Sequence, residues 1–496
     1  LSLTANGSIT QNGKIDADNT TKLDNQSNVG NITLIHSAND FTGAVSIEST
    51  NTASIISLRD SNSIDLGTIN INGSFQLTTT GAISDSGNIV VGELAQFTSN
   101  NNPITLGDST TADFKQVAFS GSSVTISENS SMDIETSSSK GALVLTANGA
   151  IIQTGAIDAD LTTTLSSGSN SITLNLANDF TGAVSLSNTG TNDVSINDID
   201  ALDLGTVSVG QNLTVTSGGA LTDSGLITVS GLAKFVATNQ NVTLGDTTAA
   251  NFGTLDFTGG AVTITEHDSM AIVAGKATGV LVLSANGAIT QTTGIIDADL
   301  TTSLSSGSFK ITLDSANDFT GALSVYNTGA VDNHISITDA NDLLIGSIDV
   351  GSTVSLTSTA GSINDATDDA TVDFTAGGLI TLTARDEIGV DATGFTNTSL
   401  EVADGSQVKI SSLTAGGIGI ASLGSVTLTD IDTTDGAITV SAAGLITATD
   451  VLSQGTTADA VTLSTTKDGV VATKVVSADA VTISADAGDI IATSVT

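Results

Sequence analysis

The chain contains 496 residues, of which 12 are basic and 52 are acidic, so its formal net charge is −40. So few basic side chains argue against a phosphate-binding surface and a nucleic-acid partner. The absence of cysteine excludes disulfide bonds, and no apolar run approaches the roughly 18 residues that a membrane-spanning helix needs. Apolar residues make up 39% of the chain, which is enough for a core.

Short runs of alternating apolar and polar residues begin near the amino terminus and continue along the chain. They are bounded by Gly, Asn, Asp and Ser, which is typical of strands and tight turns. Examples are ITLI at 32–35, AVSI at 44–47, FQLTTT at 75–80, VTIS at 124–127 and LVLT at 143–146. No window has sustained helical periodicity. The single proline, Pro103, agrees with strands that must donate their N–H groups.

Two phrases recur along the chain at a long, regular spacing. LTANGSITQNGKIDAD at 3–18 returns at 145–160 and 283–299, and SANDFTGAVSI from Ser37 returns from Leu176 and Ser315. The phenylalanines of the second phrase keep one constant spacing along the chain: Phe41, Phe180 and Phe319. We therefore expect long repeat units at 1–142 and 143–280, a partial third unit at 281–365, and shorter, degenerate coils at 366–496 that continue the same rod.

The last segment repeats at a shorter period, and we expect each long unit to consist of several repeats of this shorter length. VTLSTTKDGVVATKV from Val461 is followed by VTISADAGDIIATSV from Val481. A unit of about 20 residues is too small for a domain but suits one turn of a solenoid. The sequence therefore predicts an all-β parallel β-helix, about 115 Å long if each coil rises ~4.8 Å. An array of β-sandwich domains is the alternative, because sandwiches also place strands at short intervals.

The repeat style resembles that of filamentous-haemagglutinin-type exoproteins, which are large bacterial secreted adhesins. The phrases that carry the resemblance are LTANGAI, GNITL, LTSTAGSI and GLITLTA, and the similarity covers essentially the whole chain. It implies a right-handed parallel β-helix, a location at the cell surface and an adhesive or matrix role. The secretion domain of that family has no recognisable counterpart here.

One acidic stretch can be compared with the sites of β-helix enzymes that act on polysaccharides, which use clustered carboxylates or a carboxylate with a basic residue. Asp368 and Asp369 form the best acidic pair, with Asp365 and Asp373 nearby and Arg385 close to one coil further on. Neighbouring strand residues point to opposite faces, so the pair shares a site only within a turn. We interpret the stretch as a solvated acidic turn and expect no catalysis.

Calcium is the other chemistry that an acidic chain could support, since this ion requires six to eight oxygen ligands. Asp430, Asp432 and Asp435 resemble the opening of a calcium loop, but no glutamate closes it at the required spacing. The three IDAD phrases, at 15–18, 157–160 and 296–299, also offer carboxylates. We expect acidic turns that keep the chain soluble and no cofactor, with calcium as the open alternative.

The repeated phenylalanines are expected to form a structural core ladder: Phe41, Phe180 and Phe319. A sugar-stacking platform would favour exposed Trp or Tyr, and the chain contains no Trp and one Tyr. Together these features predict a non-catalytic extracellular fibre or adhesin stalk of the bacterial cell surface or matrix. The alternatives are a polysaccharide-active β-helix enzyme and a calcium-dependent surface-layer or biofilm-matrix protein.

The expected partners are a host or neighbouring cell surface, or other copies of the chain stacked end to end. Neither terminus carries a recognisable cap, and a β-helix without caps exposes unpaired strand edges. We expect the chain to be a segment of a longer fibre protein, with end-to-end stacking as the alternative.

Overall fold

The computed structural model describes residues 1–26, 30–329, 333–367, 369–390, 399–455 and 459–496. These residues form 55 β-strands and no helix, so they also contain no helix long and apolar enough to cross a membrane. Strands pair in parallel with strands about one coil away, as in the pairing of Leu3 with Leu23. The prediction of an all-β parallel β-helix with coils of about 20 residues is confirmed.

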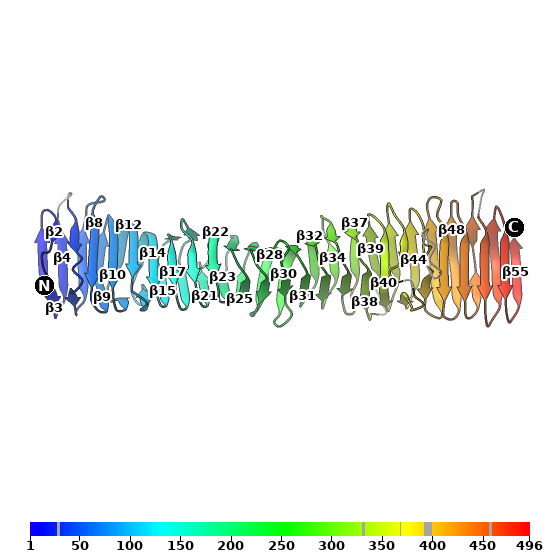
Figure 1. Ribbon diagram of the computed structural model, residues 1–496, viewed down its shortest axis with the longest axis horizontal. Coiled ribbons are helices and arrows are strands. Elements are labelled where there is room, and N and C mark those ends of the chain that lie inside the picture. The colour runs from blue at the N-terminus through cyan, green and yellow to red at the C-terminus, as the bar shows by residue number, and fades with distance from the viewer. Residues whose placement is uncertain (27–29, 330–332, 368, 391–398, 456–458) are drawn as a thin grey trace. The chain divides into compact units, whose positions relative to one another are not determined.

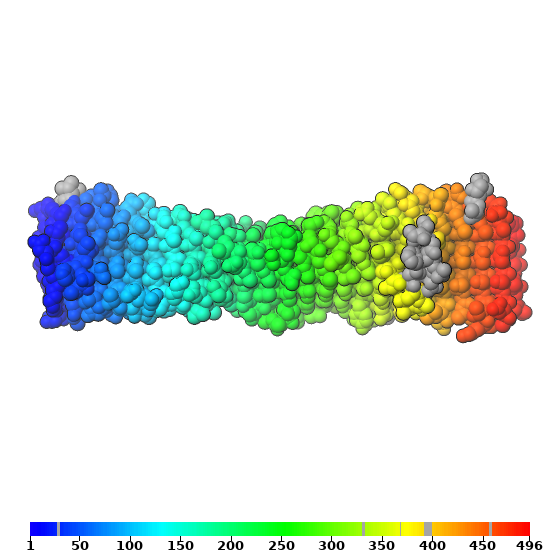
Figure 2. All heavy atoms as spheres, in the orientation of Figure 1, coloured from blue at the N-terminus to red at the C-terminus, as the bar shows by residue number. Residues whose placement is uncertain are grey.

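The contacts divide the chain into two compact units, which we call unit 1 and unit 2. Unit 1 comprises Leu1–Gln240 and Thr247–Gly253, and unit 2 comprises Asn241–Asp246 and Thr254–Thr496. In Figure 2 the surface atoms within each unit follow one another in the order of the sequence, as the colour bar shows.

In unit 1, the strands of consecutive coils lie side by side, as Figure 1 shows for β8, β10, β12 and β14. Their bounds are Ile55–Asp60, Ser74–Thr79, Ile89–Thr98 and Ala112–Gly121. One register position through this ladder is occupied in turn by Ile56, Phe75, Ala95 and Val117, all of which are buried. The period-2 alternation of the sequence thus places apolar side chains inward on every coil, where each packs on the residue one coil away.

Phenylalanines contribute the largest side chains of this core. The Phe97 ring packs edge-on against Phe75 and Phe114, with centroid separations of 5.8 and 5.6 Å. Phe41, Phe180 and Phe319 are also buried, and each lies beside an alanine of the preceding coil rather than beside another of the three. Each of these rings therefore fills its own coil once per long repeat.

Unit 2 uses the same construction, and its last coils follow the short period closely. Strands β49 (Ile438–Ala442), β52 (Val461–Thr465) and β54 (Val481–Ala485) pair in sequence, with Val461 between Ile438 and Val481. Val461 and Val481 begin the two repeated phrases of this segment. The step from one to the other is therefore one full turn of the solenoid.

The coils lengthen in one part of unit 2. Val354 of β41 (Val354–Ser358) pairs with Ile380 of β44 (Leu379–Ala384), and Ile380 pairs in turn with Val408 of β46 (Ser406–Ser412). Both steps are longer than the usual coil of about 20 residues. Because the paired strands keep their register, the extra residues lie in the connections between strands. This is also where the long repeat loses its pattern.

Tight turns between strands require glycine at particular positions. Gly107 and Gly245 occupy the same place in the repeated LGD phrase and have φ values of 71° and 72°. A Cβ atom added at Gly107 would lie 2.1 Å from the carbonyl oxygen of Ser127 on the next coil. Glycine is needed here both for the left-handed backbone and for the close approach of the next coil.

Candidate functional site

A buried asparagine organises one corner of each long repeat. Asn178 donates its Nδ2 hydrogens to the carbonyl oxygens of Leu174 at 3.1 Å and of Asn197 at 3.0 Å, while its Oδ1 accepts from Gln153 Nε2 at 2.8 Å and from the Ile157 N–H at 3.0 Å. Gln153 precedes Asn178 by about one coil, and Asn197 follows it by about one coil. A single amide therefore ties three consecutive coils together.

The same corner occurs in the other repeats. Asn317 accepts from Gln291 Nε2 at 2.7 Å and donates to the carbonyl oxygens of Leu313 and Thr338, both at 3.1 Å. Asn39 accepts from Gln11 Nε2 at 2.8 Å. All three asparagines are fully buried. Because each buried amide has partners in its own coil and in a neighbouring coil, the NDF phrase encodes a structural joint.

A buried aspartate follows each of these corners. The carboxylate of Asp198 accepts the N–H of Phe180 at 3.0 Å, and that of Asp339 accepts the N–H of Phe319 at 2.9 Å. Burial raises the pKa of both aspartates to about 6, against the opposing effect of these backbone hydrogen bonds. Burial has the same effect on the pKa of Asp60, the buried aspartate that follows the corner of Asn39.

Glu128 is a buried acid in another coil of unit 1. Its Oε1 accepts the N–H of Phe114 at 3.0 Å and the hydroxyl of Ser130 at 3.2 Å. Burial raises its pKa to about 8. Like the repeated aspartates, it supports the backbone of a core phenylalanine.

The aspartates of the IDAD phrases, which are candidate calcium ligands, form ion pairs with lysines. Lys14 Nζ lies 3.0 Å from Asp16, and Lys140 Nζ lies 3.3 Å from Asp158 and 3.1 Å from Asp160. Lys276 likewise pairs with Asp297. These ion pairs are exposed, and the lysines come from different places in the repeat, so repetition of IDAD does not by itself indicate an ion site.

The calcium candidates of the carboxy-terminal coils separate into two groups. Asp430 and Asp432 both lie on β48 (Val426–Thr433), on either side of buried Ile431, and Lys409 Nζ lies 3.0 Å from Asp430. Asp435 lies beyond the strand, where a hydrogen bond with the buried Asp459 raises its pKa. The structure thus places Asp430 near Asp432 and places Asp435 against a different acid.

Three other acids of unit 2 converge. Asp365, Asp373 and Glu401 each bring one carboxylate oxygen to within 4.8 Å of the others, and we call this set the acidic cluster. It is the one such group of three among the residues that the structure describes. Asp365 ends β42 (Ile363–Asp365), Asp373 precedes β43 (Phe374–Ala376), and Glu401 lies in β45 (Leu400–Val402).

The backbone holds the acidic cluster in position. The N–H of Glu401 donates to Asp373 Oδ2 at 2.8 Å, and the N–H of Asp373 donates to the carbonyl oxygen of Glu401 at 2.9 Å. The carboxylate of Asp365 accepts the N–H of Thr367 at 2.9 Å and that of Asp369 at 3.2 Å. Two adjacent coils therefore present these carboxylates to one point.

The surroundings of the acidic cluster disfavour its negative charge. Asp373 is 1% exposed and Glu401 is 2% exposed, whereas Asp365 is half-buried. Burial, followed by the charge of Asp373, raises the pKa of Glu401 to about 8. Burial also raises the pKa of Asp373 to about 7, with a smaller contribution from Asp365. The cluster can therefore hold a proton between its carboxyls or bind a cation.

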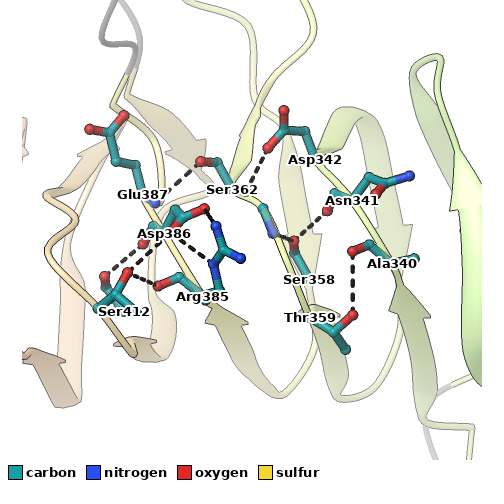
Figure 3. Close-up of polar contacts among 12 residues, drawn as sticks. Ala340, Asn341, Asp342, Ser358, Thr359, Ser362, Arg385, Asp386, Glu387 and Ser412 are labelled. Carbon is teal, nitrogen blue, oxygen red and sulfur yellow. Dashed lines mark hydrogen bonds and ion pairs between the residues drawn. The ribbon is translucent and has the colours of Figure 1, made fainter.

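Arg385 is engaged elsewhere. Its Nε and Nη2 atoms donate to the two carboxylate oxygens of Asp386 at 3.1 and 2.9 Å (Figure 3). Asp369 accepts the N–H of Thr371 at 2.7 Å within its own turn, and Asp368 lies outside the described residues. The structure thus shows Arg385 paired with its neighbour.

Polar side chains around Arg385 connect consecutive coils of unit 2. The N–H of Glu387 donates to Ser362 Oγ at 3.2 Å, and Ser412 Oγ donates to the carbonyl oxygen of Asp386 at 2.6 Å (Figure 3). One coil earlier, the N–H of Ser362 donates to Asp342 Oδ1 at 2.8 Å. This corner therefore performs the same structural task as the buried asparagines, with serines in their place.

Sequence reasoning named Asp365 and Asp373 as neighbours of an acidic pair but missed Glu401. Glu401 belongs to a lengthened coil beyond Asp373, so the short period of the other coils does not align the two. The signal available for the asparagine joint was the repeated NDF phrase together with the glutamine that follows each LTANG or LSANG phrase.

Comparison with known protein families finds one match, to a family described as repeats of unknown function (DUF5649). The matched segments are residues 1–48, 53–118, 121–187, 191–258 and 259–326. Two successive matches make up about one long repeat unit. Comparisons with curated proteins and with solved structures find no match. Because the matched segments cover more than half of the chain, the chain belongs to the DUF5649 repeat family.

Proposed function

We propose that the chain is a non-catalytic structural stalk of an extracellular fibre or adhesin, at the bacterial cell surface or in its matrix. The observation that carries this proposal is the repeated asparagine joint. In each copy the polar residues of the NDF phrase bond to their own and adjacent coils. Each further repeat that carries such a joint lengthens the stalk, since each coil adds ~4.8 Å to the stack.

The surface chemistry supports the same role. The net charge is −40, and several of the few lysines are paired with aspartates. Excess negative charge opposes association between stalks and keeps them soluble. The resemblance to filamentous-haemagglutinin-type exoproteins adds the expectation that the stalk reaches toward a host or neighbouring cell surface.

A deletion of one repeat tests this proposal in cells. Removing residues 145–282 joins one copy of the LTANG phrase to the next in register. If the chain is a stalk, labelled fibres should remain at the cell surface and become shorter by roughly seven coils, or ~34 Å. Electron microscopy of immunolabelled native cells, wild type and deletion side by side, measures both location and length.

Two results would contradict the proposal. One is label confined to the cytoplasm or to discrete free particles. The other is cleavage of an acidic polysaccharide by the purified chain, lost on substitution of Asp369, which would favour the enzyme alternative. A deletion that unfolds the protein is recognised by loss of its β-sheet circular dichroism. In that case a shorter deletion, of residues 438–480, places Val481 at the register position of Ile438, since Val461 pairs with both, and repeats the length measurement.

A further inference from the structure

The carboxylate of Glu401 is buried within the acidic cluster. Its Oε2 atom is inaccessible to solvent and receives no hydrogen bond from any described residue. The acid beside it, Asp373, is buried as well. Buried carboxylates are unfavourable unless they are hydrogen-bonded, paired with a cation or bound to a metal ion. Because Glu401 also brings a carboxylate oxygen to within 4.8 Å of those of Asp365 and Asp373, its lack of a partner points to a positive charge bound among the three acids.

The basic side chains described nearby do not supply that partner. Arg385 bonds to Asp386, and Lys409 lies 3.0 Å from Asp430. The neighbouring charges that act on Asp373 and Glu401 are all carboxylates, including those of Asp365 and Asp369. No basic group described there therefore balances the negative charge that these acids carry when they are ionised.

We propose that the acidic cluster of Asp365, Asp373 and Glu401 binds a single calcium ion. All the donors are carboxylate oxygens, which suit a hard cation, and three carboxylates offer up to six oxygens that water can supplement. Calcium accepts such an irregular shell, whereas magnesium requires a nearly ideal octahedron and retains its water. The bound ion neutralises the buried charge and gives the free Glu401 oxygen a ligand role.

The position of the site gives the ion a structural consequence. Asp365 and Asp373 flank the connection between β42 and β43, and Glu401 belongs to the adjacent coil, whose Val402 pairs with Phe374. Calcium would clamp the base of this connection and fasten it to the next coil. It would thus reinforce the part of unit 2 where the coils are longest.

Glu128 is a buried acid whose surroundings differ from those of Glu401. Glu128 is 3% exposed and its Oε2 atom also lacks a hydrogen bond from a described residue, but its Oε1 atom accepts the N–H of Phe114 and the hydroxyl of Ser130. It also lies outside the acidic cluster. Glu128 therefore serves as a control that matches Glu401 in residue type and burial but not in surroundings.

Calorimetric titration of the full chain with CaCl2, after removal of metal ions with a chelator, tests the proposal. The tightest binding event should have a stoichiometry of one and should be accompanied by a higher melting temperature. Glu401→Gln and Asp365→Asn should each weaken this event more than tenfold, whereas Glu128→Gln should leave it unchanged. Asp365 is half-buried, so its variant tests binding even if Glu401→Gln fails to fold.

Three outcomes would overturn the proposal. These are the absence of a one-to-one event in the wild type, an unchanged affinity in the folded cluster variants, and tighter binding of MgCl2 than of CaCl2. A shared proton in place of calcium would appear as the first outcome together with a Glu401→Gln variant that melts higher with or without CaCl2. The inference does not depend on the stalk function, so either can fail without the other.

Discussion

In unit 1, the Asp198 carboxylate is buried where it accepts the backbone N–H of Phe180, whereas in unit 2 the buried Asp373 and Glu401 carboxylates lie against each other. The first arrangement recurs at Asp339, one long repeat further on, and the second occurs where the coils lengthen. In regular coils, the backbone of the adjacent strand supplies partners for a buried polar group. In lengthened coils, acids from different turns meet, and an external cation or proton must balance them.

The asparagine joint of the regular coils offers the largest expected effect. Asn178→Leu removes the amide and leaves buried carbonyl groups on two coils, together with the N–H of Ile157, without partners. Each unpaired buried group costs roughly 1–3 kcal/mol, so we expect a loss of about 3–5 kcal/mol in the free energy of unfolding. Urea denaturation measures it, with the exposed Asn6→Ala as the control. A loss as small as that of the control would show that the joint contributes little.

The glycine turn should give a somewhat smaller effect. Gly107→Ala forces a left-handed φ on alanine and drives its Cβ against the Ser127 carbonyl, so we expect a loss of about 2–4 kcal/mol. Gly7→Ala is the matched control, because no atom lies within 4 Å of its added Cβ. Equal midpoints for the two variants in urea would contradict the close approach of the coils at Gly107.

The repeated aspartates predict that part of the stability depends on pH. Because burial raises the pKa of Asp198 to about 6, above the 3.8 of the unfolded chain, its contribution is fully present below pH 3.8 and is lost as pH rises through 6. Asp198→Asn removes this titration. Relative to wild type, the variant should gain roughly 2–3 kcal/mol between pH 4 and pH 8.

Denaturation curves collected at both pH values measure this gain, and the exposed Asp108→Asn variant controls for the change in net charge. A variant whose stability parallels that of wild type at every pH would contradict the burial of a titrating Asp198. The same measurement on Asp339→Asn would test whether the repeat reproduces the property in unit 2.

The exposed ion pairs should have the smallest effect. Lys140 lies near Asp158 and Asp160 on the surface, where solvent and salt weaken such attractions. We expect Lys140→Ala to leave the melting temperature within error of wild type at about 0.15 M salt. A clear decrease, removed by salt at about 1 M, would instead assign these pairs a role in holding the coils together.

The sequence by itself determined the class of fold and its period. Alternating apolar residues specify which side chains point inward, and tandem phrases such as those from Val461 and Val481 specify how far one coil lies from the next. Both features are local or strictly periodic, so they can be recognised without coordinates. The burial of the NDF phenylalanines follows from the same pattern.

The tertiary structure alone decided which polar groups meet. Lys140 reaches Asp158 from the preceding coil, Asp435 pairs with Asp459 rather than with Asp432, and Glu401 joins Asp373 across a lengthened coil. The sequence cannot show such contacts, because the length of each connection between strands sets which residues become neighbours in a stack, and these lengths vary most where the repeat ends. Burial then gives the assembled acids properties that none of them has in isolation.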